Sequence, residues 1–149
     1  MATRGRQLAI AALSGLGLAD SLYMLAYEEG LIDSLMCPFF GEGCNKVGRS
    51  QHARHFGVPN AAAGVLGYAA MGGLSLAAPP RRRSWPAFAV AGISTAAAAA
   101  SVFLTWEQAA KVKAWCFWCL SSAAINAAIL PLSLSNLPRR WPSRQGRRT

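Results

Sequence analysis

The sequence predicts an all-α fold, an integral membrane four-helix bundle, from two observations. Hydrophobic residues make up 53% of the 149 residues and charged residues only 14%, whereas a soluble globular domain averages roughly a quarter charged residues. The formal net charge is nevertheless +9, from 15 Lys and Arg against 6 Asp and Glu. A chain can be both apolar and basic only if the two properties are separated along it. This composition argues against disorder, and against nucleic acid as a partner of a folded basic surface.

Four apolar stretches supply the helices, because each is close to the length of about 20 residues that a helix needs to cross a bilayer. They lie near residues 7–27, 60–78, 85–106 and 115–134. Prolines mark their ends: Pro59 suits the start of the second helix, Pro79 follows that helix, and Pro86 opens the third. We therefore expect one membrane domain over residues 1–137.

A secretory signal peptide is the alternative interpretation of the first stretch. A basic start, an apolar run and small residues at Gly17 and Ala19 are typical of such a segment and its cleavage site. The apolar character resumes after Asp20 and continues to Tyr27, which is longer than a signal peptide requires. We therefore favour a full membrane span.

The distribution of charge predicts the orientation. Ten basic residues and no acidic residue fall in three segments: the N-terminus, the connection between the second and third stretches, and the C-terminus. These residues are Arg4, Arg6, Arg81, Arg82, Arg83, Arg139, Arg140, Arg144, Arg147 and Arg148. Four crossings place the three segments on one side, which the positive-inside rule assigns to the cytoplasm. We expect a protein of the cell inner membrane with both termini cytoplasmic, a periplasmic first connection, and a basic, disordered tail over residues 138–149.

The four cysteines form two pairs, and the predicted topology places both pairs on the non-cytoplasmic side, where disulfides persist. Cys37 and Cys44 lie in the first connection with six residues between them. Cys116 and Cys119 form a C-x-x-C motif at the start of the fourth stretch. Two structural disulfides or one zinc site are the simpler interpretations, but zinc prefers two short C-x2–4-C hooks. We expect no metal.

The C-x-x-C motif has the features of a reactive pair. A thiolate of Cys116 at a helix N-terminus is stabilised by the helix dipole, and Lys111 and Lys113 add positive charge nearby. A disulfide in a glycine-flanked, mobile loop beside such a thiol suits thiol–disulfide exchange. A lipid-soluble quinone is a fitting two-electron acceptor at the membrane edge, where Phe117 and Trp118 flank the motif, although these aromatic residues also suit an interfacial belt.

The sequence resembles the vitamin K epoxide reductase (VKOR) family from the first helix to Asn126. The resemblance rests on Cys37, on the segment Cys44-Asn45-Lys46-Val47-Gly48-Arg49-Ser50, on Phe56-Gly57-Val58-Pro59-Asn60 and on Trp115-Cys116-Phe117-Trp118-Cys119-Leu120. A lone C-x-x-C would be weak support. Two cysteine pairs with these neighbours, in order on a four-span scaffold, are far more specific.

The resemblance implies a four-helix bundle around a quinone, capped by an amphipathic half-helix for which residues 47–56 are the candidate. By the roles known in the family, Cys37 receives electrons from a thioredoxin-fold protein and Cys44 exchanges with Cys116. Cys119 then reduces the quinone.

Further site residues follow from the resemblance and from position. Ser50 would position the loop, and Asn60 would donate an amide hydrogen bond to a quinone carbonyl. Asn126 lies two helical turns beyond Cys119, where it would line the pocket or form an interhelical hydrogen bond. Animal members carry Tyr where this chain has Ala123, which weakens an assignment of epoxide reduction.

The sequence therefore predicts a membrane thiol–disulfide oxidoreductase, active as a monomer, that supports disulfide bond formation. It would reoxidise a separate, DsbA-like thioredoxin-fold protein of the periplasm and reduce ubiquinone or menaquinone. His52 and His55 would either move protons to the quinone or be solvated on the cap.

Three alternatives stay open. A DsbB-like quinone reductase has the same chemistry, but its two cysteine pairs usually occur in the reverse order. A small four-span transporter would use Asp20 for proton coupling and keep its disulfides as structural bonds, since an intramembrane acid is a functional candidate, although Asp20 could equally lie at the interface. A non-catalytic membrane scaffold would show no thiol-dependent turnover.

Overall fold

The computed structural model describes residues 2–78 and 85–137. The basic residues 81–83 and the predicted tail over residues 138–149 lie outside these ranges. The described chain is mainly helical, which confirms the all-α prediction.

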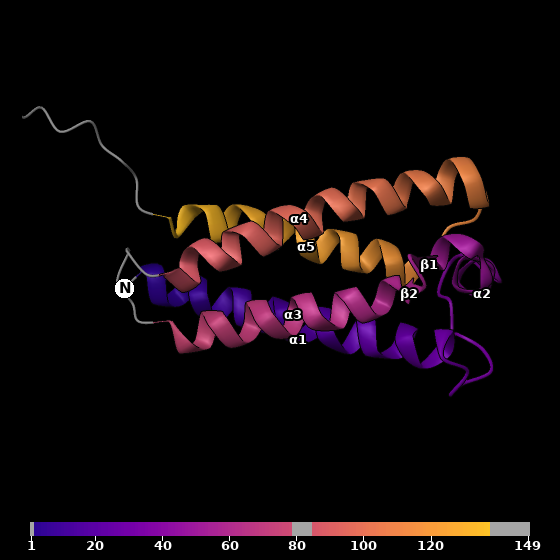
Figure 1. Cartoon of the computed structure of the whole chain (residues 1–149), viewed down its shortest axis with the longest axis horizontal. Coiled ribbons are helices and arrows are strands. Elements are labelled where there is room, and N and C mark those ends of the chain that lie inside the picture. The colour runs from indigo at the N-terminus through magenta and orange to yellow at the C-terminus, as the bar shows by residue number, and fades with distance from the viewer. Residues whose placement is uncertain (1, 79–84, 138–149) are drawn as a thin grey trace, which may run out of the picture.

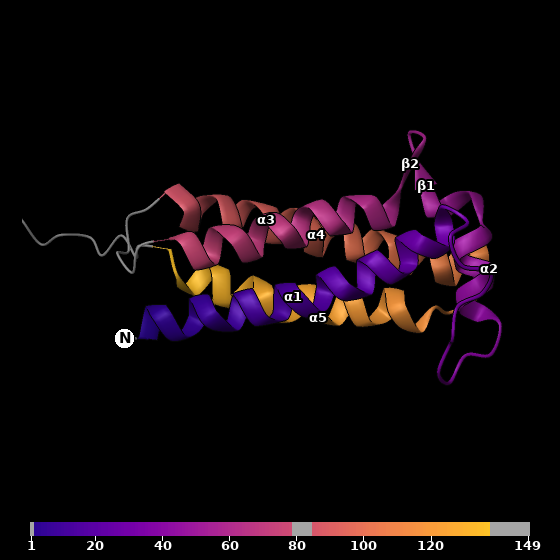
Figure 2. The ribbon, with the colours of Figure 1, turned by 90° about the horizontal axis from the view of Figure 1, so that it is seen from below.

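Four long helices lie side by side along the molecule (Figures 1 and 2). They are α1 (Ala2–Glu28), α3 (Asn60–Ala77), α4 (Trp85–Glu107) and α5 (Phe117–Ser135). Helix α1 packs against α3 and α5, and α4 packs against the same two helices. The start of α1 and the ends of α3 and α5 lie at one end of the molecule, and all the short elements lie at the other (Figure 1).

Three of the four predicted spans have counterparts that are long and apolar enough to cross a membrane. Within the described residues these are Arg4–Glu28, Trp85–Val112 and Phe117–Ser135. Helix α3 is not among them, because its 18 residues include four glycines as well as Asn60 and Tyr68, which lower its mean hydropathy. The composition of α3 instead suits close contact with a neighbouring helix.

Small residues let α1 and α3 approach closely, as they do in many membrane helix pairs. A Cβ atom on Gly17 of α1 would overlap the ring of Tyr68, and one on Gly64 of α3 would overlap the side chain of Ser21. The two helices therefore share the most extensive contact among the described elements.

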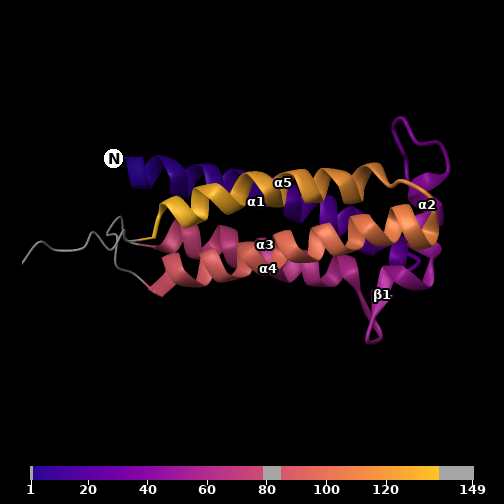
Figure 3. The same ribbon diagram turned by 90° about the horizontal axis from the view of Figure 1, so that it is seen from above.

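A cap of short elements covers one end of the four helices. It comprises α2 (Gly43–Arg49), a 3-10 turn (Gln51–Ala53) and an antiparallel hairpin of β1 (Arg54–His55) and β2 (Val58–Pro59). The hairpin projects to one side of the bundle (Figures 2 and 3).

The capping helix is found, but not at the expected residues 47–56. It begins at Gly43 and ends at Arg49, because Ser50 is extended (φ −70°, ψ 155°) and its hydroxyl donates a 2.8 Å hydrogen bond to the Val47 carbonyl. Phe56 and Gly57 have φ angles of 56° and 78°, which form a tight hairpin turn and exclude a right-handed helix.

Helix α4 continues into a π-helical segment, η2 (Gln108–Val112), before the chain turns back. The turn is made at Lys113, which has a left-handed backbone with φ 57°. A short extended segment then leads to α5. This connection lies beside α2 and sets the position of the C-x-x-C motif.

Candidate active site

The C-x-x-C motif opens helix α5, as the sequence predicted. Cys116 is the N-cap residue, and its sulfur accepts a 3.4 Å hydrogen bond from the backbone N–H of Cys119. The backbone N–H of Cys116 itself donates to Oε1 of Gln108, at 2.9 Å. Both Cys116 and Gln108 are buried, so the first turn of the helix is held by contacts that exclude water.

The two cysteine pairs are in different redox states. Cys37 and Cys44 form a disulfide, whereas Cys116 and Cys119 are free thiols. Cys44 and Cys116 are both fully buried and belong to one apolar cluster. The backbone N–H of Phe117 donates to the Cys44 sulfur at 3.3 Å, so the disulfide lies beside the first turn of α5.

Close backbone contact makes this arrangement possible. A Cβ atom on Gly43 would overlap the carbonyl oxygen of Trp115, so only glycine allows α2 to lie against the segment that leads to α5. On the other side of the loop, the Trp118 indole donates to the Met36 carbonyl at 2.6 Å, and the Met36 N–H donates to the Tyr23 hydroxyl at 3.0 Å. The residue before Cys37 is thus held at both of its backbone polar groups.

The environment of Cys116 favours its thiolate. The pKa of Cys116 lies below its ordinary value, chiefly because the Cys119 thiol donates a hydrogen bond to the Cys116 sulfur. Burial opposes this shift, and backbone N–H groups of the helix support it. The Lys111 ammonium, which the sequence suggested would add positive charge near Cys116, lies over the Trp106 ring, 5.6 Å from its centre.

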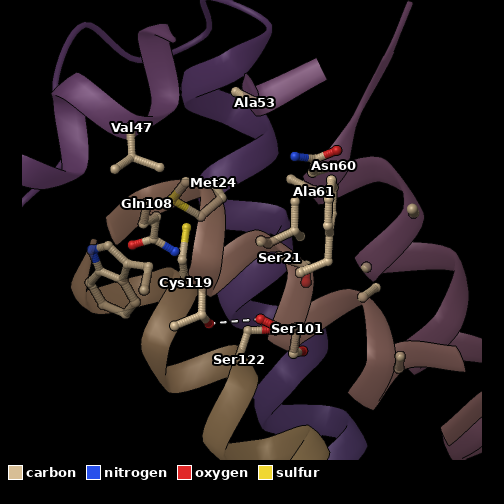
Figure 4. A pocket seen from close by; sticks show the side chains of 18 of the residues that line it. Ser21, Met24, Val47, Ala53, Asn60, Ala61, Ser101, Gln108, Cys119 and Ser122 are labelled. Carbon is tan, nitrogen blue, oxygen red and sulfur yellow. Dashed lines mark hydrogen bonds between the residues drawn. The ribbon is translucent and has the colours of Figure 1, made fainter. Parts of the chain in front are cut away.

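A cavity of about 380 Å³ lies between the four long helices and the cap. Cys119 lines it, together with Ser50, Asn60, Trp118 and Asn126, which the sequence predicted for the quinone. Figure 4 shows Cys119 and Asn60 on different sides of this cavity, with Ser21 and Met24 of α1 between them.

The remaining predicted site residues lie elsewhere. Phe117 is not among the residues that line the cavity, and its ring packs against Phe39 and Trp118, with centroid distances of 6.2 and 5.4 Å. Cys37, Cys44 and Cys116 also lie outside its walls. The structure thus separates a thiol that faces the cavity from one that lies beside the disulfide.

A polar cluster forms the part of the cavity under the hairpin. Asn60 Oδ1 lies 2.8 Å from His55 Nδ1, and Asn60 Nδ2 donates to the His52 carbonyl at 2.8 Å. Glu107 lies beyond the two histidines: its Oε1 is 3.1 Å from His52 Nδ1, and its Oε2 is 3.3 Å from His55 Nε2. All four residues line the cavity.

The deeper part of the cavity is lined by side chains with unused acceptors. Asn126 donates to Ser101 Oγ at 2.8 Å, so it both lines the cavity and joins two helices. Asp20 is buried, and neither its Oδ1 nor the Oδ1 of Asn126 has a partner among the described residues. The Tyr68 hydroxyl lies 2.7 Å from Ser122 Oγ, next to Ala123.

Sequence reasoning missed three buried polar residues of the site. Gln108 caps Cys116, Glu107 joins the histidines, and Asn45 holds the loop by accepting from the Leu35 N–H at 2.8 Å and donating to Glu42 at 3.0 Å. The adjacent polar pair Glu107-Gln108 at the end of a long apolar stretch was the available signal.

Within the described ranges, no group of three or more His, Cys, Asp or Glu side chains is arranged to hold a metal ion.

A family model described as the vitamin K epoxide reductase family matches residues 8–134 of the chain. The matched region includes all four cysteines, the cap and nearly the full length of the four long helices.

Proposed function

Because the chain belongs to the vitamin K epoxide reductase family, an oxidoreductase family, we propose that it is a thiol–disulfide oxidoreductase that passes two electrons from a protein dithiol to a membrane quinone. One observation carries this proposal. The C-x-x-C motif has one thiol, Cys119, in the wall of the cavity and the other, Cys116, in the buried cluster that contains the Cys37–Cys44 disulfide.

Electrons would enter at Cys37. This residue is partly exposed whereas Cys44 is fully buried, so a thiolate of another protein can reach the Cys37 sulfur. Attack by the partner's thiolate forms a mixed disulfide between the partner and Cys37 and releases the Cys44 thiolate. A second thiol of the partner then attacks this mixed disulfide and releases the Cys37 thiolate. The partner would be a separate, DsbA-like thioredoxin-fold protein, which leaves as a disulfide.

Exchange inside the protein would then move the two electrons to the C-x-x-C motif. The Cys44 thiolate attacks Cys116 of an oxidised Cys116–Cys119 pair, and Cys37 attacks Cys44 in turn. This restores the Cys37–Cys44 disulfide and leaves two thiols on α5, which is the redox state described above.

The cavity has the size and character of a small-molecule site. A volume of about 380 Å³ lies within the range typical of ligand pockets, which are mainly apolar with a few placed polar groups. The Cys119 thiolate would add to the quinone, and Cys116 would attack the Cys119 sulfur, so that a disulfide forms and hydroquinone leaves. Asn60 has an amide hydrogen to offer the carbonyl oxygen as it gains negative charge, and ubiquinone and menaquinone are both candidates.

The chain is a membrane protein, as its family and its three long apolar helices indicate. We further propose that α3 is the fourth span of a four-helix membrane bundle. The ten arginines of the three basic segments favour an inner-membrane orientation with cytoplasmic termini. The cap and both cysteine pairs would then face the periplasm.

The proposal is tested with purified protein in detergent, a reduced thioredoxin-fold donor, and either ubiquinone or menaquinone followed optically. Cys119→Ser should abolish quinone reduction. Cys37→Ser should block electron entry from the protein donor but should still allow quinone to oxidise Cys116 and Cys119 once a small dithiol has reduced them. Normal turnover by Cys119→Ser would overturn the mechanism. The transporter alternative would be favoured if the cysteine variants kept transport across the membrane and Asp20→Asn lost it.

A further inference from the structure

We propose that Glu107, His55 and His52 form a proton-transfer site that delivers hydrogen to the quinone oxygen held by Asn60. The inference rests on the proposed function and adds the residues that would carry its protons. Quinone reduction needs them, because a two-electron transfer from thiols leaves the two quinone oxygens negatively charged unless each gains a proton.

The three side chains come from separate parts of the chain and meet at one carboxylate. Glu107 ends α4, His52 lies in the 3-10 turn and His55 lies in β1. The carboxylate oxygens of Glu107 are 3.1 Å from His52 Nδ1 and 3.3 Å from His55 Nε2. The other ring nitrogen of His55, Nδ1, lies 2.8 Å from Asn60 Oδ1. The cluster therefore ends on the residue proposed to hold the carbonyl.

The cluster also connects water to the cavity. The His52 and His55 side chains are 26% and 34% exposed, whereas that of Glu107 is 8% exposed. All three residues line the cavity that Cys119 enters. A proton taken up by a histidine at the surface of the cap can thus pass to a group that faces the substrate without crossing the apolar wall.

The chemical step balances in protons and electrons. The two thiols release two protons to water as thiolates form. The Cys119 sulfur bonds to the quinone, and the carbonyl electron pair moves to oxygen, which takes a proton from the cluster. Cys116 then attacks the Cys119 sulfur, the carbon–sulfur bond breaks, and the departing hydroquinone takes its second proton from the cluster after it has been reloaded from water.

Other charged groups also face the cavity or the hairpin, and the Glu28 carboxylate accepts a hydrogen bond from the backbone N–H of Ala61, the residue after Asn60. Asp20 and Glu28 of α1 line the same cavity. Arg54 on the hairpin is engaged by Glu29 at 2.8 Å, and Lys111 of η2 lies over Trp106.

The position of the histidine proton sets the expected pH profile. The pKa of His55 lies above its ordinary value, first because Asn60 accepts a hydrogen bond from its ring and also because Glu107 is close; burial opposes both. His55 is therefore fully protonated, and able to donate a proton, at acidic pH, and it loses this proton as the pH rises through the raised pKa. A Glu107→Gln substitution removes the carboxylate, lowers the pKa of His55, and moves that loss to lower pH.

The test is single-turnover reduction of a short-chain quinone by the full-length protein, with Cys116 and Cys119 pre-reduced by a small dithiol, from pH 5.5 to 9. The wild-type rate should rise with thiolate formation and fall again at alkaline pH. Glu107→Gln should move the falling limb to lower pH and slow the reaction at pH 8 by about 10²-fold, the lower end of what general acid–base catalysis contributes. His55→Gln should remove the falling limb, and it gives a second variant should Glu107→Gln fail to fold.

The matched control is Glu29→Gln, which removes an acid of the same length that contacts the hairpin through Arg54 but does not line the cavity. Its rate and both limbs should equal those of the wild type. An unchanged falling limb in Glu107→Gln, or a slowing by the same factor at every pH, would overturn the proton-transfer role. If the wild-type protein left quinone oxidised at every pH, the proposed function itself would fail, so the two failures are distinct.

Discussion

At the scale of single residues, the start of the C-x-x-C motif is held in place by Gln108, a side chain with no reactive group. Gln108 is buried in the π-helical segment and accepts the hydrogen bond of the Cys116 N–H. Without this acceptor, a buried N–H at the first turn of α5 would have no partner. Such a group costs about 1–3 kcal/mol.

Gln108→Leu should therefore lower the free energy of unfolding by about 1–3 kcal/mol, measured by unfolding in mixed detergent micelles. Gln7→Leu is the matched control. Gln7 is also buried, but within the described ranges its side chain makes one hydrogen bond, a long one of 3.5 Å to the Ala78 carbonyl, and its Oε1 has no partner there. An equal loss in both variants would mean that the hydrogen bond to Cys116 contributes nothing specific.

The residue scale also marks where sequence reasoning stops. The four cysteines were recognisable because their chemistry is rare and their spacing is regular. Glu107 was not, because its contacts with His52 and His55 join residues 55 and 52 positions apart. A single acid at the end of an apolar stretch looks the same in sequence whether it meets water or two histidines.

At the scale of elements, the packing of α1 on α3 depends on small residues that the two helices place against each other. Gly17 leaves room for the ring of Tyr68, and the Tyr68 hydroxyl forms a hydrogen bond with the Ser122 hydroxyl on α5. Tyr68 thereby contacts one helix and bonds to another beside the cavity. Overfilling this contact should force the helices apart.

Gly17→Ala should therefore destabilise the protein by about 1–3 kcal/mol, the usual cost of overpacking. Gly15→Ala on the same helix should instead be neutral or stabilising by up to about 1 kcal/mol, because a Cβ atom there meets nothing within 4 Å and alanine favours helix. Unfolding of both variants in the same detergent series measures the difference. Similar effects at the two positions would show that helix propensity, and not the Tyr68 contact, decides the result.

The elements also separate what periodicity predicts from what it does not. The long apolar stretches predicted the helices well, since length and hydropathy are properties of the local sequence. The capping helix was predicted too far along the sequence, at residues 47–56. It starts at Gly43 instead, where glycine can approach the Trp115 carbonyl, and this contact joins segments far apart in the sequence. The positive φ angles of Phe56 and Gly57 form a hairpin turn, so the predicted helix cannot extend to residue 56.

At the scale of the whole molecule, the four helices bring the disulfide, the free thiols and the cavity to one end. The start of α1 and the ends of α3 and α5 lie at the opposite end (Figure 1). The separation of charge along the sequence predicted that both cysteine pairs share one side, and the structure places them together at the capped end. Some of the cavity wall was predicted, at Ser50, Asn60 and Asn126, but most of its lining was not, because residues from all four long helices and the cap form that wall.

The central claim is that two electrons pass from Cys116 and Cys119 to a quinone, and single-turnover stoichiometry tests it most directly. Protein with a Cys37–Cys44 disulfide and reduced Cys116 and Cys119 is mixed with excess quinone, and disulfides are then mapped by mass spectrometry. We predict one hydroquinone and one new Cys116–Cys119 disulfide per chain, formed at equal rates. Hydroquinone formation without that disulfide, or a C-x-x-C motif that stays reduced in the presence of quinone, would contradict the account.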